Sequence, residues 1–419
     1  MVRICFKTII IIGVIVSINT CNNKREASTN LPLNQTSGLT TGTALEVAMS
    51  AKGIGSAEKL FMDAVEQGKV LGYQLVVARR GKVILDVAGG SRDLEKQLPM
   101  DRNTLLRMAS NTKSITAVGV LTLLDQGLIS LDDPIGNYLS GFEESLSSKI
   151  TIKQLLTHTS GYTDFAPFAG DIFLDEDGEP ANPDLIREAT KLGKLGPEIE
   201  PGTFYRYNNR GYNILAALIE KVSGKKLESY IKETIFEPLE MSQTSYRVWG
   251  VDSTRMANQY WIAEGHWEKL DVWDVEFPRG SAGINSTAQD WAKFGQMLLN
   301  NGVYNGHRIL EEQTVKEARS AIIDVPEAYL PLEIEQEMGF ESEWFEYRDK
   351  RDLGLDISRG YGFVVSNEGV FSHAGIFGTF MYVDPKRELV GVILTQSIYG
   401  GNPGQAFIEA INAAILDYP

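Results

Sequence analysis

Residues 107–127, RMASNTKSITAVGVLTLLDQG, join a polar turn to an apolar stretch. Apolar side chains recur at helical spacing over residues 115–124, and Gly127 is placed to end the helix. Ser110 and Lys113 stand three residues apart at the start of this helix, so their side chains share one face. The lysine is out of place by ordinary rules, because burial disfavours a charged ammonium. The stretch therefore suggests a chemical rather than a packing role for Lys113.

A serine three residues before a lysine is a weak signal by itself. The chain has four such pairs, namely Ser56/Lys59, Ser110/Lys113, Ser223/Lys226 and Ser229/Lys232. All except Ser110/Lys113 lie in stretches that predict surface helices. A desolvated, neutral lysine can accept a serine proton. Backbone N–H groups at a helix start are unpaired, so the N–H of Ser110 is suited to half of an oxyanion hole. We therefore predict Ser110 as a nucleophile and Lys113 as its base.

A second motif is TFYRYNNRGYN at residues 203–213. A tyrosine held near cations, here Tyr207, can pass protons to a leaving group. The amide of Asn209 can hold a substrate carbonyl and the lysine together. Taken alone, the pair is more typical of a core tyrosine and a loop asparagine with structural roles.

A third motif is HAG, where His373 and Gly375 lie inside an apolar strand pattern. A glycine in a strand allows another backbone or a ligand to approach closely. The N–H of Ile376 is then well placed as a second oxyanion donor. In isolation, a histidine in a strand usually has a structural role.

Together the three motifs resemble those of the penicillin-recognising serine hydrolases, which include class C β-lactamases, D-Ala-D-Ala carboxypeptidases and related esterases. The resemblance covers residues 44–416 and extends to connecting phrases, namely LDDPIGNYL, ITIKQLLTHTSGYTDF, EPGTFYRYNNRGYNILAALIEKVSG and GSAGINSTAQDWAKFGQMLLNNG. Such a set is specific for the superfamily and says little about the substrate.

The resemblance implies a role for each motif. Ser110 would be acylated, Lys113 would activate it, and Tyr207 would relay protons to the leaving group and activate water for deacylation. Asn209 would position the substrate, and the N–H groups of Ser110 and Ile376 would form the oxyanion hole. His158, in the phrase LTHTSG, is interpreted as structural.

One position departs from the family pattern. His373 stands where many members carry the lysine of a Lys-Thr-Gly motif. A histidine is mostly neutral at pH 7, so the fixed charge that helps to hold a β-lactam carboxylate is missing. Esters and other amides are therefore the first substrates to expect, then D-Ala-D-Ala peptides, then β-lactams.

The order of predicted elements is helix, strands, helical middle, strands, helix. It favours an α+β fold of the β-lactamase/transpeptidase type, with an antiparallel sheet flanked by helices and a mostly helical second subdomain. We expect a sheet subdomain from about residues 44–109 and 285–419 and a helical subdomain from about 110–284. Expected details are a hairpin at 73–90, a helix capped by Ser286 or Thr287, two strands around the turn at Asp384, and a final helix at 404–416.

The first residues, MVRICFKTIIIIGVIVSINTC, predict a secretory signal over residues 1–20. The apolar run at 9–18 is shorter than the ~20 residues that a membrane-spanning helix needs. Cys21 is the candidate lipid-carrying residue of a bacterial lipoprotein facing the periplasm or cell surface; plain secretion and an uncleaved anchor are the alternatives. Residues 21–43 are polar and predict a flexible tether that leads to a hydrolase domain at 44–419.

After cleavage the chain would keep no thiol beyond Cys21, which excludes an internal disulfide, a cysteine nucleophile and a cysteine zinc site. The chain has 419 residues, 43% of them hydrophobic, and a formal net charge of −15, so a large core is expected and nucleic acid is not an expected partner. The expected partners are a small ester, amide or D-amino peptide substrate and, through the lipid, a membrane; no cofactor is expected.

Two function classes compete with a serine hydrolase. One is a membrane-tethered ligand-binding protein that keeps the pocket and lacks turnover, which the intact motifs disfavour. The other is a metal hydrolase, but the four histidines at positions 158, 266, 307 and 373 lack the spacing of metal ligands. The acidic, aromatic stretch 323–359 is interpreted as a solvated excursion or as the rim of a site.

Overall fold

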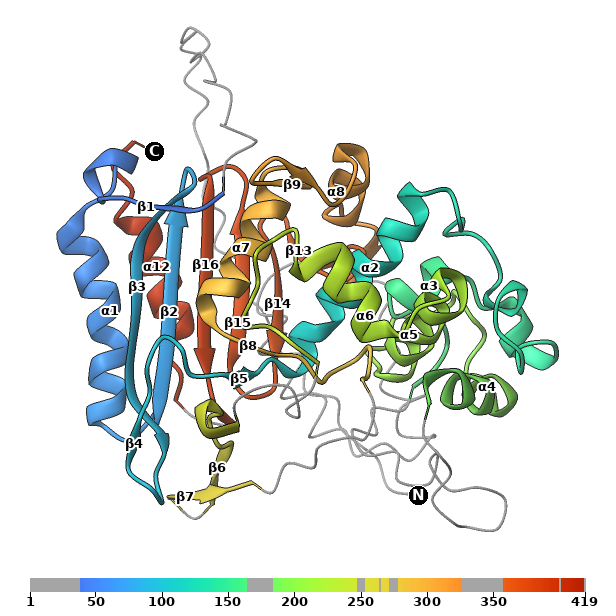
Figure 1. The fold of residues 1–419 in the computed structure, drawn as a ribbon, viewed down its shortest axis with the longest axis horizontal. Helices are drawn as coiled ribbons and strands as arrows, with labels where there is room; N and C mark the ends of the chain where they lie inside the picture. Colours follow the sequence, from blue (N-terminus) through green and yellow to red (C-terminus); the bar gives the residue numbers. More distant parts are fainter. Residues whose placement is uncertain are drawn as a thin grey trace, which may run out of the picture. The chain divides into compact units, whose positions relative to one another are not determined.

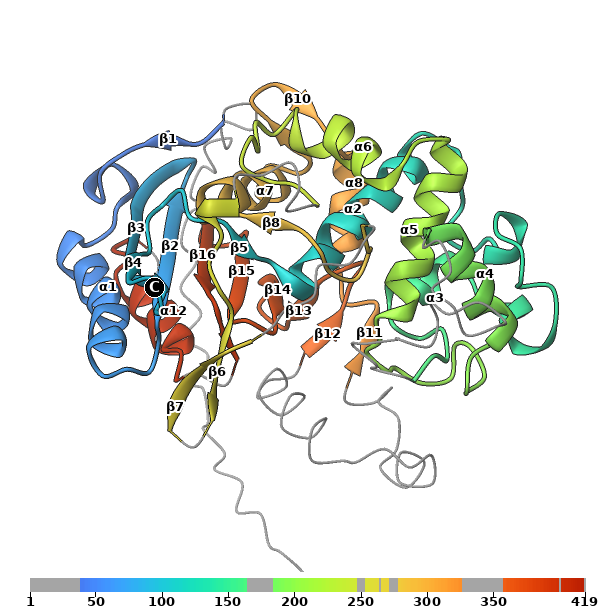
Figure 2. The ribbon, with the colours of Figure 1, turned by 60° about the horizontal axis from the view of Figure 1, so that its bottom comes forward.

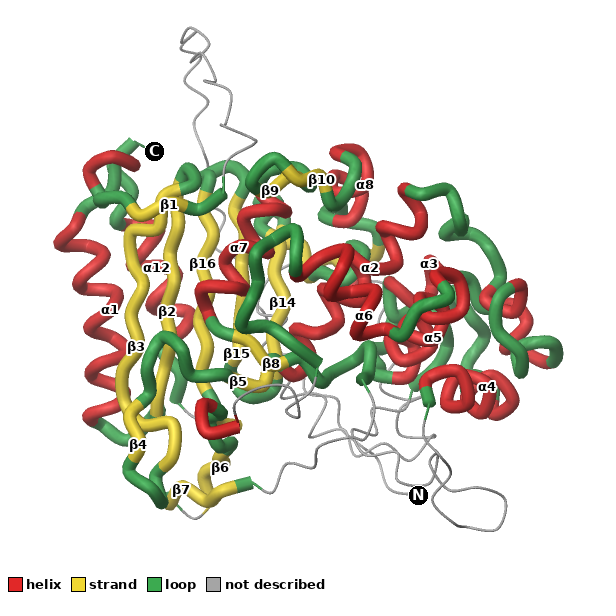
Figure 3. The backbone as a smooth tube through the Cα atoms, in the orientation of Figure 1, coloured by secondary structure: helices red, strands yellow, loops and turns green. Residues whose placement is uncertain are grey.

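The computed structural model describes residues 38–163, 184–246, 253–263, 265–270, 278–325, 357–398 and 401–417. In this part of the chain a large sheet carries helices on both faces, and a mainly helical region lies beside it (Figure 1, Figure 3). The α+β fold class and the antiparallel sheet that the sequence predicts are confirmed.

The main sheet joins strands from both ends of the chain. Its central pair is antiparallel, with Leu75 opposite Ile393. The first strand in the sequence runs parallel to its neighbour, and the other pairs described in this sheet are antiparallel. In sheet order the strands are β1 (Thr40–Thr41), β3 (Lys82–Asp93), β2 (Gly72–Arg79), β16 (Leu389–Thr395), β15 (Thr379–Asp384), β14 (Phe371–Gly375), β13 (Val364–Ser366), β12 (Ile357–Arg359) and β11 (Ile323–Asp324), with β4 (Leu98–Pro99) paired to β3.

Helices α1 (Ala51–Glu66) and α12 (Gly404–Ala413) cover one face of this sheet, and α7 (Ala288–Leu299) covers the other (Figure 2). The rings of Phe61 and Phe407 meet at 5.6 Å and are fully buried against the first face. Thr287 caps α7 by accepting the N–H of Asp290, as the sequence predicts.

The helical region is built around α5 (Arg210–Ser223), which packs against several neighbouring helices. The other helices are α2 (Thr112–Asp125), α3 (Ile152–Leu156), α4 (Leu185–Leu195), α6 (Leu227–Ile231) and, nearer the sheet, α8 (Glu312–Ala318). Short turns of helix are η1 (Leu45–Val47), η2 (Ala109–Asn111), η3 (Ile135–Asn137), η4 (Ser145–Lys149), η6 (Lys232–Phe236) and η8 (Ser253–Arg255). Three small sheets accompany the main one in the described residues. Two of them are the pairs β5 (Leu106–Arg107) with β8 (Asn285–Ser286) and β9 (Val303–Tyr304) with β10 (His307–Arg308), and the third has the order β17 (Ser397–Ile398), β6 (Tyr260–Ala263) and β7 (His266–Lys269).

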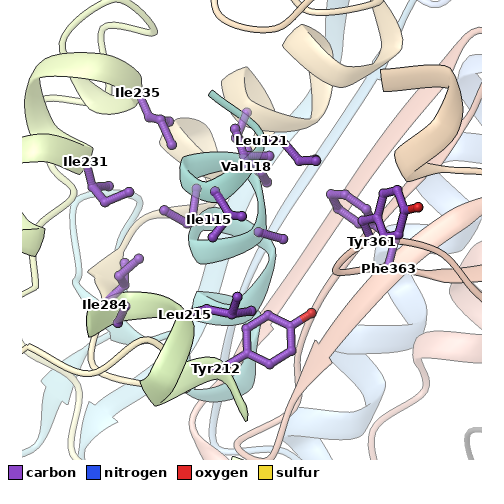
Figure 4. Close-up of a cluster of buried hydrophobic side chains, with 14 of the residues drawn as sticks. Ile115, Val118, Leu121, Tyr212, Leu215, Ile231, Ile235, Ile284, Tyr361 and Phe363 are labelled. Atoms are coloured by element: carbon purple, nitrogen blue, oxygen red, sulfur yellow. The ribbon is translucent and has the colours of Figure 1, made fainter. Parts of the chain in front are cut away.

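Helix α2 lies where the two regions meet. Figure 4 shows Ile115 and Val118 between side chains such as Ile231 on one side and Phe363 on the other. Every residue of α2 from Thr112 to Leu123 is buried, so the helix is enclosed on all sides. Each large aliphatic side chain buried in this way stabilises the fold by about 1.5–3 kcal/mol.

Two further expectations are corrected. The predicted tether at 21–43 is too long at its C-terminal end, because Thr40 donates its N–H to the Gly81 carbonyl at 3.0 Å and Leu39 donates to the Tyr304 hydroxyl at 3.2 Å. The apolar segment around the Asp384 turn contains three strands rather than two, since the chain also reverses between β14 and β15.

Parts of the other expectations fall outside the described residues. These are the signal segment, Cys21 and most of the stretch 323–359, whose two ends form the paired strands β11 and β12. Within the described ranges, no helix is both long enough and apolar enough to cross a bilayer.

Candidate active site

Lys113 lies at the start of α2 with its side chain fully buried. Its Nζ donates to Ser110 Oγ at 3.3 Å, to Asn209 Oδ1 at 2.7 Å and to the Ser281 carbonyl at 3.0 Å. The structure therefore brings together the serine, lysine and asparagine that the sequence singles out. The Ser281 carbonyl is an additional partner that sequence reasoning missed, since any residue type can supply it.

The short helix η2 presents Ser110, and the strand pair β14–β15 holds it in place. Thr379 Oγ1 donates to the Met108 carbonyl, and Asn111 Nδ2 donates to the Thr379 carbonyl, each at 3.0 Å. A Cβ on Gly375 would lie 2.5 Å from that same Met108 carbonyl, so only glycine fits there. Ala109 has φ +46°, a left-handed conformation that costs a non-glycine residue about 1–2 kcal/mol.

Tyr207 lies beside two basic side chains. The Nζ of Lys113 is 4.8 Å and the guanidinium carbon of Arg359 is 5.7 Å from the centroid of its ring. The sequence predicts basic groups near this tyrosine. No motif identifies Arg359, which lies at the end of β12. The arrangement places the Tyr207 ring next to Lys113, as the predicted proton relay requires.

His158 braces the backbone on both sides of Tyr207. Its carbonyl accepts the N–H of Arg206 at 2.8 Å, and its Nδ1 accepts the N–H of Asn208 at 3.3 Å. Its ring lies 4.5 Å from the Tyr207 ring with 33° between the planes. The residue adopts φ +58°, so this contact is made in a conformation that few residue types tolerate.

The HAG motif forms the end of β14. His373 is buried, with its Nδ1 2.8 Å from the Ala374 carbonyl. Side chains alternate along a strand, so His373 and Gly375 face the same side of the sheet, and Gly375 packs against the turn that carries Ser110. Ile376 follows directly and is partly exposed.

The family model named Beta-lactamase matches residues 57–414. The chain belongs to this family.

Among curated relatives of this chain, Protein Rv1367c of Mycobacterium tuberculosis (strain ATCC 25618 / H37Rv) is 26% identical over 370 residues, covering 80% of this chain and 88% of the relative. Protein flp of Staphylococcus aureus (strain COL) is 24% identical over 363 residues, covering 84% of this chain and 65% of the relative.

Solved structures show the same fold. They include EstCE1, described as a hydrolase with promiscuous acyltransferase activity, at TM-score 0.69 and 20% identity, covering 87% of this chain and 99% of that chain. They also include the octameric penicillin-binding protein homologue from Pyrococcus abyssi, at TM-score 0.66 and 23% identity, covering 86% of this chain and 76% of that chain.

Metal ligation was the remaining chemical alternative. Within the ranges that the structure describes, no group of three or more histidine, cysteine, aspartate and glutamate side chains is arranged to hold a metal ion.

Proposed function

We propose that this Beta-lactamase family member is an extracytoplasmic serine hydrolase that forms an acyl-enzyme on Ser110 and cleaves a small ester or amide. The observation that carries the proposal is the buried Lys113 amine, which contacts both Ser110 Oγ and Asn209 Oδ1. Family membership supports a serine acyl hydrolase or acyl transferase. Export and membrane attachment through Cys21 are supported by the sequence pattern alone.

The geometry supports a two-step mechanism. As Ser110 Oγ attacks the substrate carbonyl, Lys113 accepts the hydroxyl proton and the N–H groups of Ser110 and Ile376 stabilise the oxyanion. Tyr207 passes a proton to the departing alcohol or amine, which leaves Ser110 acylated. Water then gives up a proton to Tyr207 and attacks the acyl ester. Lys113 returns its proton to Ser110 Oγ as the acid leaves, which restores the free serine and the neutral lysine.

The position of His373 bears on the substrate. Because a histidine is mostly neutral at pH 7, it does not supply the fixed charge of a lysine to a substrate carboxylate. EstCE1, which shares this fold, is described as a hydrolase with promiscuous acyltransferase activity, and such an activity is compatible with an acyl-enzyme on Ser110. D-Ala-D-Ala peptides and β-lactams are the alternative substrates.

The proposal is tested with an activated ester such as p-nitrophenyl acetate. Ser110→Ala is expected to abolish turnover with the thermal melt nearly unchanged, and Lys113→Ala is expected to lower turnover about 10²–10⁴-fold, because proton transfer is lost. Ser56→Ala is the matched control, since Ser56 has the same spacing to a lysine on the exposed face of α1. Wild-type turnover by Ser110→Ala would refute the assignment.

Two further probes sort the alternatives. Intact-mass spectrometry after incubation with benzylpenicillin would show an adduct that Ser110→Ala lacks, or hydrolysed drug, for a cell-wall peptidase or a β-lactamase. Unmodified protein together with intact drug favours a small ester or amide as the substrate. If no fluorophosphonate labels the purified protein, the ligand-binding alternative replaces the hydrolase.

A further inference from the structure

Glu188 is a buried carboxyl that the mechanism above does not use. It lies on α4 in the helical region with 4% of its surface exposed. Its Oε1 accepts a hydrogen bond from Asn213 Nδ2 at 2.9 Å, while its Oε2 is buried without a hydrogen-bond partner in the described structure. Burying a carboxyl in this way is unfavourable, so its contacts need a reason.

Asn213 connects this carboxyl to the candidate active site. Its Oδ1 accepts the N–H of Ser281 at 3.2 Å, and the Ser281 carbonyl accepts the hydrogen bond from Lys113 Nζ at 3.0 Å. Glu188 is thus linked to the lysine through the side chain of Asn213 and the two backbone groups of Ser281.

Glu188 also determines which way the Asn213 amide points. An amide side chain has one accepting end and one donating end. The oxygen must face the Ser281 N–H, which turns the NH2 group towards α4. Glu188 supplies the acceptor on that side. If the Asn213 amide turned over, its NH2 group would face the Ser281 N–H, and two donors would then oppose each other.

The segment that carries Ser281 is also held in place at Gly280, by contacts with α2 and α5. The Gly280 carbonyl accepts from Thr116 Oγ1 at 2.8 Å, and a Cβ on Gly280 would lie 2.1 Å from the Tyr212 carbonyl. The segment is therefore wedged between α2 and α5. A small shift of Asn213 would therefore also move the Ser281 carbonyl, which accepts the hydrogen bond from Lys113.

The charge state of Glu188 does not decide this role. Burial raises the pKa of Glu188, and the nearby Arg279 guanidinium and the hydrogen bond from Asn213 oppose that rise. Both the carboxylate and the neutral acid can accept from the Asn213 amide. The link to Ser281 is available in either form.

We propose that Glu188 is a positioning residue for Lys113, acting through Asn213 and the Ser281 carbonyl. The inference rests on the proposed function of Lys113 as the base that activates Ser110. A purely structural role, in which Glu188 only helps α4 to pack on α5, predicts loss of stability without a specific loss of acylation.

The test compares four variants of the full chain, with the acylation rate at saturating p-nitrophenyl ester as the readout. Glu188→Met and Asn213→Leu each break the relay and are expected to slow acylation about tenfold or more, with the half-saturating ester concentration changed less than about twofold. Glu188→Gln keeps the accepting oxygen and is expected to stay within about threefold of wild type. Because the residues act through one chain of contacts, Glu188→Met with Asn213→Leu is expected to be no slower than the slower single variant.

Glu220 provides the matched control. It is also a buried carboxyl in the helical region, on α5, and it accepts the N–H of Leu227 at 2.9 Å. Glu220→Met is expected to lower the thermal melt and leave acylation unchanged. If Glu188→Met does not fold, Asn213→Leu still tests the role of Glu188, because it removes the donor of the hydrogen bond between Asn213 and Glu188.

Several results would overturn the inference. They are wild-type acylation by Glu188→Met or Asn213→Leu, an equal loss in Glu188→Gln and Glu188→Met, or fully additive losses in the double variant. If the wild type shows no Ser110-dependent turnover, the proposed function fails instead. Amide hydrogen exchange then tests the relay alone: the Ser281 N–H must exchange faster in Glu188→Met than in wild type and Glu220→Met, and equal exchange refutes it.

Discussion

Four serine–lysine pairs in this chain have the same spacing and different surroundings. The side chains of Lys59, Lys226 and Lys232 are 67%, 70% and 67% exposed, whereas Lys113 is fully buried. Spacing alone predicts that serine and lysine share a helix face. Burial then decides the chemistry, because a lysine surrounded by water stays a solvated cation.

His158 offers a test of how Tyr207 is held. His158→Ala removes the ring contact and leaves the Asn208 N–H without its acceptor, which costs about 1–3 kcal/mol for a buried donor. We expect turnover of the activated ester to fall at least about tenfold and the thermal melt to drop. Steady-state kinetics and a melting curve measure both.

His158→Asn separates the two contributions. Asparagine tolerates a left-handed backbone and carries its Oδ1 where histidine carries Nδ1, so the bond from Asn208 is kept while the ring contact with Tyr207 is lost. Turnover between those of wild type and His158→Ala is expected. If His158→Ala keeps wild-type turnover, His158 supports only the fold.

Strands β14 and β15 position η2, and Gly375 is the residue that permits it. In Gly375→Ala the new methyl group would lie 2.3 Å from Thr379 Oγ1 and 2.5 Å from the Met108 carbonyl. Overpacking of this kind costs about 1–3 kcal/mol. Because the turn carrying Ser110 must move, we expect fluorophosphonate labelling to slow by about a hundredfold.

Gly55 allows the same substitution without the clash. It lies on α1, and a Cβ there would meet nothing within 4 Å. Gly55→Ala is expected to stabilise the helix by about 0.5–1 kcal/mol and to leave labelling unchanged. Equal labelling rates in Gly375→Ala and wild type would show that η2 does not depend on this close approach.

The elements that the sequence predicts correctly are those that depend on residues close together in the chain. The hairpin of β2 and β3, the cap of α7 at Thr287 and the i,i+3 pair at the start of α2 all depend on neighbouring residues. The break between β14 and β15 was missed because HAGIFGTF is an almost unbroken apolar run. Gly378, with φ +77°, makes the reversal there, and a lone glycine in a strand pattern does not distinguish a turn from a close contact.

The complete molecule assembles the site from segments far apart in the sequence. Lys113 meets a carbonyl 168 residues away at Ser281, and Asn213 links that residue to Glu188 on a different helix. No local pattern encodes such contacts, which explains why Ser281, Glu188 and Arg359 could not be predicted while the motif residues could. The sheet shows the same dependence, since β2 pairs with β16 near the other end of the chain.

Acid stability of the whole protein depends on carboxyl groups with opposite behaviour. The hydrogen bond from Tyr138 lowers the pKa of Asp133, so this group stabilises the fold above its ordinary value of 3.8 and loses that contribution in acid. Burial raises the pKa of Glu188 from its ordinary value of 4.5. The folded protein therefore keeps the Glu188 proton to a higher pH than the unfolded chain does.

The sign for Glu188 follows from this difference in proton binding. Its contribution to stability is fully present below pH 4.5 and is lost as the pH rises through its folded-state pKa. Glu188→Gln cannot ionise, so the unfolding free energy of the variant minus that of wild type must increase as the pH rises from 4.5. Asp133→Asn must change in the opposite direction below pH 3.8. Urea unfolding midpoints at a series of pH values measure both, and a flat or falling difference for Glu188→Gln would mean that burial does not control this carboxyl.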